Sequence, residues 1–186
     1  MTQAQLINKK INDLFSKDTA TFEEVAVAGL EIIDLSVIEI KKEANITCRG
    51  KKCSHCCTNS IIGLSYIEYL NILKVYPEAK KRIKRKAPNL KKSIMGKYIN
   101  DNLNTNKLGD CPFLKNDLCQ IYDARPIACR TFFSIDDPKL CEDGKSHNLI
   151  NSNSNEVTKY INETFQAICI DNVPKQAYLE IRDFFK

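Results

Sequence analysis

CRGKKCSHCC, residues 48–57, places four of the chain's nine cysteines within one short stretch. Cys53 and Cys56 form a C-x2-C unit, in which two intervening residues let both sulfurs meet one metal while nearby backbone N–H groups point at the thiolates. Two such sulfurs are half of a tetrahedral zinc site, or half the ligands of a cubane cluster. The stretch therefore predicts that the other ligands come from elsewhere in the chain.

A second cysteine group runs from Cys111 to Arg130, with the pattern C-P-F-L-x4-C-x-I-Y-x2-R-P-x2-C-R. Its cysteines, Cys111, Cys119 and Cys129, are the candidates for the missing ligands. The two groups together contain seven cysteines, whereas a single zinc ion or [4Fe–4S] cluster needs about four. The excess fits a binuclear site, or a cluster with additional redox-active or structural thiols, better than one structural zinc.

Three cysteines need separate interpretations. Cys57 follows Cys56 directly, and adjacent side chains tend to point in different directions, so the two do not easily share one mononuclear ion. One of them could bind a second metal, bridge, pack in the core or act as a reactive thiol. Cys169 lies in the helical pattern TFQAICI and is expected to behave as a small buried apolar residue. Cys141 is intermediate between such a buried apolar residue and a cysteine of the metal-binding groups.

Composition and charge indicate a globular protein without a membrane span. The chain has 186 residues, enough for one domain with a hydrophobic core, and its formal charge of +5 does not by itself indicate nucleic-acid binding. The N-terminus lacks the apolar run and cleavage site of a signal peptide, and no apolar stretch approaches the roughly 18 residues of a span. We expect a cytoplasmic protein, in which clustered cysteines are more often metal ligands or redox groups than disulfides.

The hydrophobic pattern predicts a mainly α fold, a helical domain with a cysteine-rich, loop-built metal site. Residues 3–16 form an amphipathic pattern, and capping boxes at Thr21–Glu24 and Ser65–Glu68 predict two further helix starts. The first of these helices is expected to reach about residue 43, and the second to stop before Pro77. Residues 155–168 and 174–185 are also expected to be helical.

The organisation that we expect is a single domain over residues 1–186. N-terminal helices occupy 1–45, a cysteine-rich metal-binding core occupies 46–145, and C-terminal helices occupy 150–186. The region that carries Pro112, Pro126 and Pro138 is too broken for long helices.

The cysteine motifs resemble the CxxCxxCC family, which is described as a zinc- or iron-chelating domain and often labelled as iron–sulfur-containing. The resemblance rests on C-S-H-C-C, C-P-F-L and C-Q-I-Y-D-A-R-P-I-A-C-R-T-F, in that order, and covers roughly residues 48–133. It implies the following metal ligands: Cys53, Cys56, Cys57, Cys111, Cys119 and Cys129, with Cys48 as the leading cysteine. The sequence departs from the family at Cys48, because four residues instead of two separate it from Cys53.

Two arginines of the same motif, Arg125 and Arg130, are candidate cofactor-binding residues. Arginines beside thiolates lower their pKa and offset the negative charge of a metal–thiolate centre. A structural alternative for Arg125 is pairing with a carboxylate or holding the loop. His55 could also ligate, although the ring of a residue inside C-x2-C usually points away.

These observations predict a cysteine-ligated metal-binding protein that holds an iron–sulfur cluster of the [4Fe–4S] type, with Zn²⁺ as the alternative metal. Its role would be electron transfer, metal handling or modification of a partner protein, and whether it is an enzyme stays open. The alternative from another class is a zinc-stapled interaction module that binds a protein or nucleic acid through the basic run 78–92.

A third interpretation follows from the resemblance alone. One branch of the family is similar to flagellin lysine N-methylases, which implies cluster-dependent methyl transfer to protein lysine. Those chains are longer, and no glycine-rich S-adenosylmethionine loop is present in this sequence.

Overall fold

The structure of the protein is a computed structural model that describes residues 2–16, 21–43, 54–84, 108–142, 149–151, 156, 159–161, 163 and 178–186. Most of its regular structure is helical, which confirms the predicted mainly α class. Within these residues, no helix has the length and apolar character that crossing a membrane requires.

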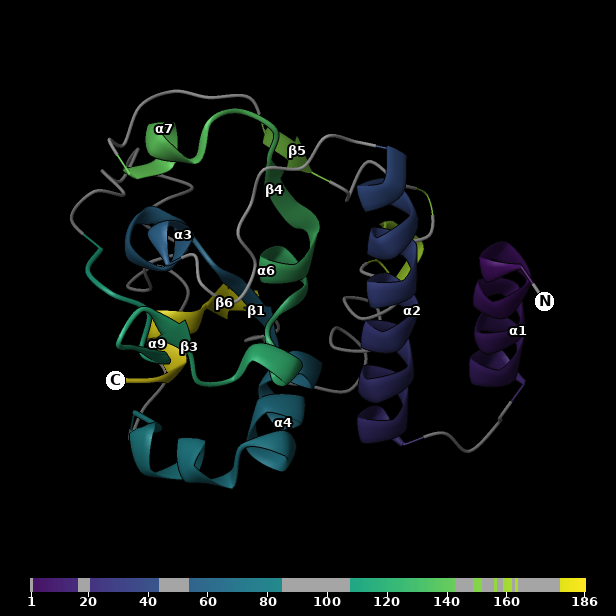
Figure 1. The fold of residues 1–186 in the computed structure, drawn as a ribbon. Helices are drawn as coiled ribbons and strands as arrows, with labels where there is room; N and C mark the ends of the chain where they lie inside the picture. Colours follow the sequence, from purple (N-terminus) through teal and green to yellow (C-terminus); the bar gives the residue numbers. More distant parts are fainter. Residues whose placement is uncertain are drawn as a thin grey trace.

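The N-terminal part is a pair of helices, α1 (Gln3–Phe15) and α2 (Phe22–Glu43), which lie side by side and run in opposite directions (Figure 1). The predicted capping box begins α2: the Glu24 N–H donates to the Thr21 hydroxyl at 3.3 Å, and the Thr21 N–H donates to the Glu24 carboxylate at 2.8 Å. These contacts satisfy backbone donors that the first turn of a helix leaves without partners. The predicted bounds of both helices are confirmed to within about one residue.

The first cysteine group leads into a short helix, a strand and a capped helix. The elements are α3 (His55–Asn59), β1 (Gly63–Ser65), α4 (Tyr66–Val75) and the 3-10 helix η2 (Pro77–Arg82). The second predicted capping box is confirmed, since the Glu68 N–H donates to the Ser65 hydroxyl at 3.3 Å and the Ser65 N–H donates to the Glu68 carboxylate at 2.8 Å. The α4 helix ends before Pro77, as expected. Most of the basic run, from residue 85 on, lies outside the described residues.

The second cysteine region is built from short elements, as its prolines predict. They are β2 (Leu114–Lys115), β3 (Leu118–Cys119), the 3-10 helix η5 (Tyr122–Ala124), α6 (Ile127–Thr131), β4 (Phe132–Ser134) and α7 (Pro138–Glu142). The β2–β3 hairpin turns at Asn116 and Asp117, with φ angles of 52° and 58°. A two-residue turn with both φ values positive matches the twist of the strands that it joins.

The C-terminal segment differs from the sequence expectation. Residues 178–180, expected to be helical, form strand β6 (Tyr178–Glu180), and only α9 (Ile181–Phe184) is helical in the described part of 174–185. The β6 strand pairs antiparallel with β1, with Gly63 opposite Glu180, and this tertiary pairing overrides the local helical pattern. Another strand, β5 (Leu149–Asn151), pairs with β4. The described residues of the expected helix 155–168 are helical.

Buried apolar residues form two clusters. The first surrounds α2 and includes Ile32, Ile33 and Phe133. The second includes Phe113, Phe185 and Cys111, and other cysteines pack against it. It lies where α4, the β2–β3 hairpin and the C-terminal elements meet (Figure 1). Among the described cysteines, Cys111 is therefore part of a hydrophobic core, and Cys57, Cys119 and Cys129 pack against that core.

Candidate metal centre

The α3 helix carries the last two cysteines of the first group. Cys56 lies exposed on it, Cys57 is partly buried, and the Cys57 N–H donates to the Ser54 carbonyl at 2.8 Å. The Ser54 hydroxyl lies 3.1 Å from the Asp117 carboxylate in the turn between β2 and β3. The start of α3 thus contacts the second cysteine region. Cys48 and Cys53 lie outside the described residues.

A backbone hydrogen bond joins the two cysteine groups directly. The Cys111 N–H donates to the Cys57 carbonyl over 2.7 Å. Cys111 itself is buried in the second core, against which Cys57, Cys119 and Cys129 pack. The structure therefore brings the second group back onto the first.

Cys129, on α6, interacts electrostatically with four other described thiols. Burial raises its pKa well above the ordinary value, and negative charge on neighbouring thiols raises it further. The thiols that act on it are those of Cys111, Cys57, Cys56 and Cys119. Four of the other predicted ligands thus act electrostatically on Cys129. A metal ion there would replace mutual repulsion between thiolates with attraction to a shared cation.

Backbone N–H groups point at two of the sulfurs. The Phe113 N–H donates to the Cys111 sulfur, and the Ile121 N–H donates to the Cys119 sulfur, each from two residues further along the chain. Both contacts lower the thiol pKa, although burial outweighs them and raises the pKa of Cys111 to about 11. N–H donors aimed at sulfur stabilise thiolate, the form that binds metals.

The two arginines of the motif have structural partners. Arg130 is buried, pairs with Asp34 of α2, and donates to the Arg125 carbonyl at 2.8 Å and to the Asp123 carbonyl at 2.6 Å. Its guanidinium thus ties α6, the helix of Cys129, to α2. The role of Arg130 in binding a cofactor stays a prediction.

Arg125 acts electrostatically on one of the thiols, that of Cys119. Its guanidinium lies 3.9 Å from the centre of the Tyr122 ring and 3.8 Å from the Asp34 carboxylate. Its positive charge lowers the pKa of Cys119, against the larger effect of burial. This arrangement contains both roles considered for Arg125, a carboxylate partner and a charge that offsets thiolate, and its role toward a cofactor also stays a prediction.

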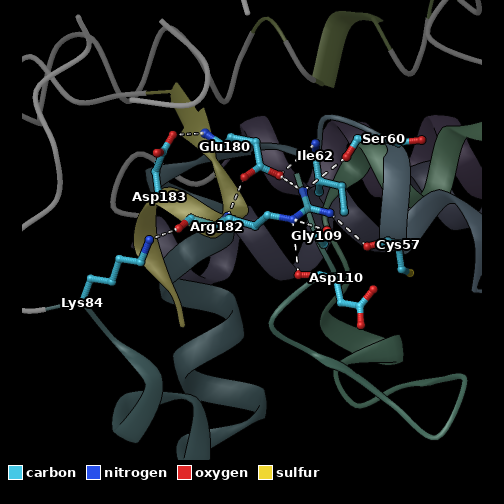
Figure 2. Close-up of polar contacts among 9 residues, drawn as sticks. All are labelled: Cys57, Ser60, Ile62, Lys84, Gly109, Asp110, Glu180, Arg182 and Asp183. Atoms are coloured by element: carbon cyan, nitrogen blue, oxygen red, sulfur yellow. Dashed lines mark hydrogen bonds and ion pairs between the residues drawn. The ribbon is translucent and has the colours of Figure 1, made fainter. Parts of the chain in front are cut away.

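Two residues that the sequence patterns did not single out for the site support these segments. The buried Glu68 carboxylate accepts the Ile127 N–H at 2.6 Å and so joins α4 to the start of α6. Arg182, in α9, contacts the Cys57 carbonyl of the first cysteine group and the Gly109 carbonyl just before the second group (Figure 2). No motif marks Arg182 for the site, because the carbonyls to which its guanidinium donates lie more than 70 residues away in sequence.

The chemistry of the donors fits zinc or iron. The six described cysteines are thiols and not disulfides. No three Cys, His, Asp or Glu side chains among the described residues are already arranged to hold one ion. Cys141 lies in α7, which contacts α3, and Cys169 lies outside the described residues. A sulfur-rich donor set selects zinc or iron–sulfur clusters over magnesium or calcium.

One comparison with known proteins identifies a relationship. A family model named CxxCxxCC, described as "Putative zinc- or iron-chelating domain", matches residues 47–164. The match covers more than half of the chain, includes both cysteine groups and ends before the C-terminal segment 178–186. No curated protein and no solved structure matches the chain.

Proposed function

The chain belongs to the CxxCxxCC family, and we propose that it binds iron as an iron–sulfur cluster through its two cysteine groups. The observation that carries this proposal is that cysteines of both groups meet at one core cluster: Cys57 and Cys129 pack against the cluster that contains Cys111, and the Cys111 N–H donates to the Cys57 carbonyl. The proposed ligands are drawn from Cys53, Cys56, Cys57, Cys111, Cys119 and Cys129, with Cys48 as a further candidate.

The number and arrangement of thiols support a cluster over a single structural zinc. One zinc ion takes four ligands, whereas five described thiols interact here and two more cysteines precede α3. The adjacent Cys56 and Cys57 both act electrostatically on Cys129. Several iron atoms with bridging sulfides offer more positions for such thiols than one ion does.

The protein's own contribution is to bury and orient the sulfurs. Phe113 is fully buried beside Cys111, and its backbone N–H donates to the Cys111 sulfur. Burial and N–H···S hydrogen bonds are among the factors that set the reduction potential of a cluster. A bound cluster would supply one-electron chemistry, and we place the protein's role in electron transfer, metal handling or modification of a partner protein.

The interaction module receives less support from the described part of the basic run 78–92. There Lys81 pairs with Glu78, Arg82 donates to the Pro112 carbonyl, and Lys84 donates to the Arg182 carbonyl. Lys81 is thus paired with a carboxylate, and Arg82 and Lys84 donate to carbonyls of the chain itself, which leaves fewer of their N–H donors available for a partner.

The test is the content of iron, zinc and acid-labile sulfide in anaerobically purified protein, together with its visible absorption spectrum. We expect iron with matching sulfide and a broad charge-transfer absorption that makes the protein brown. Zinc without iron or colour would show that the protein holds a structural zinc and not an iron–sulfur cluster. Protein that holds neither metal after expression with both supplied would overturn the proposed function.

A further inference from the structure

The C-terminal segment, residues 178–186, lies against the cysteine-bearing core although the family match ends at residue 164. Its β6 strand pairs with β1, and the Ile181 N–H donates to the Ile62 carbonyl at 2.9 Å. The Lys84 N–H donates to the Phe184 carbonyl at 2.8 Å, and the Lys186 N–H donates to the Arg82 carbonyl at 2.9 Å. These contacts place α9 at a fixed position beside both cysteine groups.

Arg182 uses that position to contact four backbone carbonyls (Figure 2). Its Nη2 donates to the Cys57 carbonyl at 2.9 Å, and its Nη1 donates to the Ser60 carbonyl at 3.3 Å. Its Nε is shared between the Gly109 carbonyl at 3.1 Å and the Asp110 carbonyl at 3.3 Å. The first two carbonyls belong to the α3 region, and the other two directly precede Cys111.

We propose that Arg182 is a positioning residue of the metal centre, which sets the placement of Cys57 relative to Cys111. The Cys57 carbonyl that accepts from Arg182 also accepts the Cys111 N–H, so the guanidinium holds the junction between the two cysteine groups. This inference rests on the proposed function and extends the site to a segment beyond the family match.

The geometry requires arginine and not merely a positive charge. A guanidinium presents five N–H donors in a rigid plane, which lets it reach carbonyls on two sides at once. A lysine ammonium is a compact charge and cannot span the same partners. Glu180 provides the counter-charge: it is fully buried, pairs with Arg182, and accepts the Arg182 N–H at 2.7 Å and the Ile62 N–H at 3.3 Å.

The first experiment compares metal release to a chelator from wild type, Arg182→Lys and Arg182→Gln. We expect both variants to release metal roughly 10–100-fold faster, the usual effect of losing a group that orients metal ligands. The similar loss in Arg182→Lys, which keeps the charge, would identify geometry as the cause. The matched control is Phe185→Leu, which loosens the same segment at its contact with the Phe113 ring but leaves the guanidinium in place.

The second experiment uses the metal-free chain and measures hydrogen exchange of the Cys111 amide. We expect Arg182→Lys to speed this exchange by about tenfold, because the carbonyl that accepts this N–H is no longer held. The Gln120 amide, bonded to the Phe113 carbonyl within the hairpin, is the internal reference and is expected to change less. This readout also reports on variants whose global stability is reduced.

The outcomes separate this inference from the proposed function. Arg182 variants that hold metal as tightly as wild type would overturn the positioning role alone. The same follows if Phe185→Leu releases metal as fast as they do, or if the Cys111 and Gln120 amides speed up equally. A wild-type chain without metal would overturn the proposed function and, with it, the role of Arg182.

Discussion

Glu68 is a buried carboxylate that serves two helices at once. It caps the start of α4 through Ser65, and it also accepts the Ile127 N–H at the first residue of α6. The sequence predicted the cap, because the capping box lies within four consecutive residues. The contact with Ile127 could not be predicted, since it joins segments that only the folded chain brings together.

This burial predicts a specific pH dependence of stability. Burial raises the pKa of Glu68 above its ordinary value of 4.5, and hydrogen bonds from Ser65 and Ile127 and the charge of Arg130 oppose it only in part. Because the pKa is higher in the folded chain, the stabilisation linked to this proton is present below about pH 4.5 and is lost as the pH rises through the folded-state pKa.

The measurement is urea unfolding of wild type and Glu68→Gln between about pH 7 and about pH 4.5. Other titrating groups are shared, so the difference in unfolding free energy isolates this carboxyl. We expect the unfolding free energy of wild type minus that of Glu68→Gln to increase as the pH falls. A difference that stays constant, or decreases, as the pH falls would contradict a raised pKa of Glu68 in the folded chain.

At the scale of elements, local signals predicted the helices and long-range pairing produced the strands. Capping boxes and Pro77 marked the ends of α2 and α4 within a few residues of sequence. The β1–β6 pair joins residues 63–65 to 178–180, and strands this short carry too little pattern to be recognised. The β2–β3 turn was also missed, although Asn-Asp between two short apolar runs is a turn signal.

The attachment of α6 to α2 is a second prediction at this scale. Arg130 is buried and pairs with Asp34. The substitution Asp34→Asn removes the carboxylate that pairs with this buried guanidinium and should destabilise the fold by about 1–3 kcal/mol. The matched control is Glu31→Gln, also on α2, which breaks an exposed pair with Lys10 and should cost less than about 1 kcal/mol.

Urea unfolding of both variants checks this comparison. Equal losses of unfolding free energy in Asp34→Asn and Glu31→Gln would show that the Arg130 pair does not hold α6 in place.

At the scale of the whole molecule, one core supports the helices and the other supports the cysteines. The two cysteine groups could be recognised from spacing, because C-x2-C and the C-P-F-L and R-P-x2-C-R motifs are local patterns, whereas the assignment of their seven cysteines as ligands follows from the resemblance to the family and stays a prediction. The residues that hold those segments together, Glu68 and Arg182, could not, because each acts through partners distant in sequence. Sequence thus predicts candidate donor atoms, and the fold determines how the segments that carry them are positioned.

The most direct test of the central claim, that the thiols around Cys129 hold a metal, is the metal-to-protein ratio of wild type, Cys129→Ser and Cys169→Ser. Four other thiols act electrostatically on Cys129, whereas Cys169 belongs to neither cysteine group. We expect Cys129→Ser to lose its metal and Cys169→Ser to retain nearly the wild-type amount. Equal metal content in the three proteins would contradict the account.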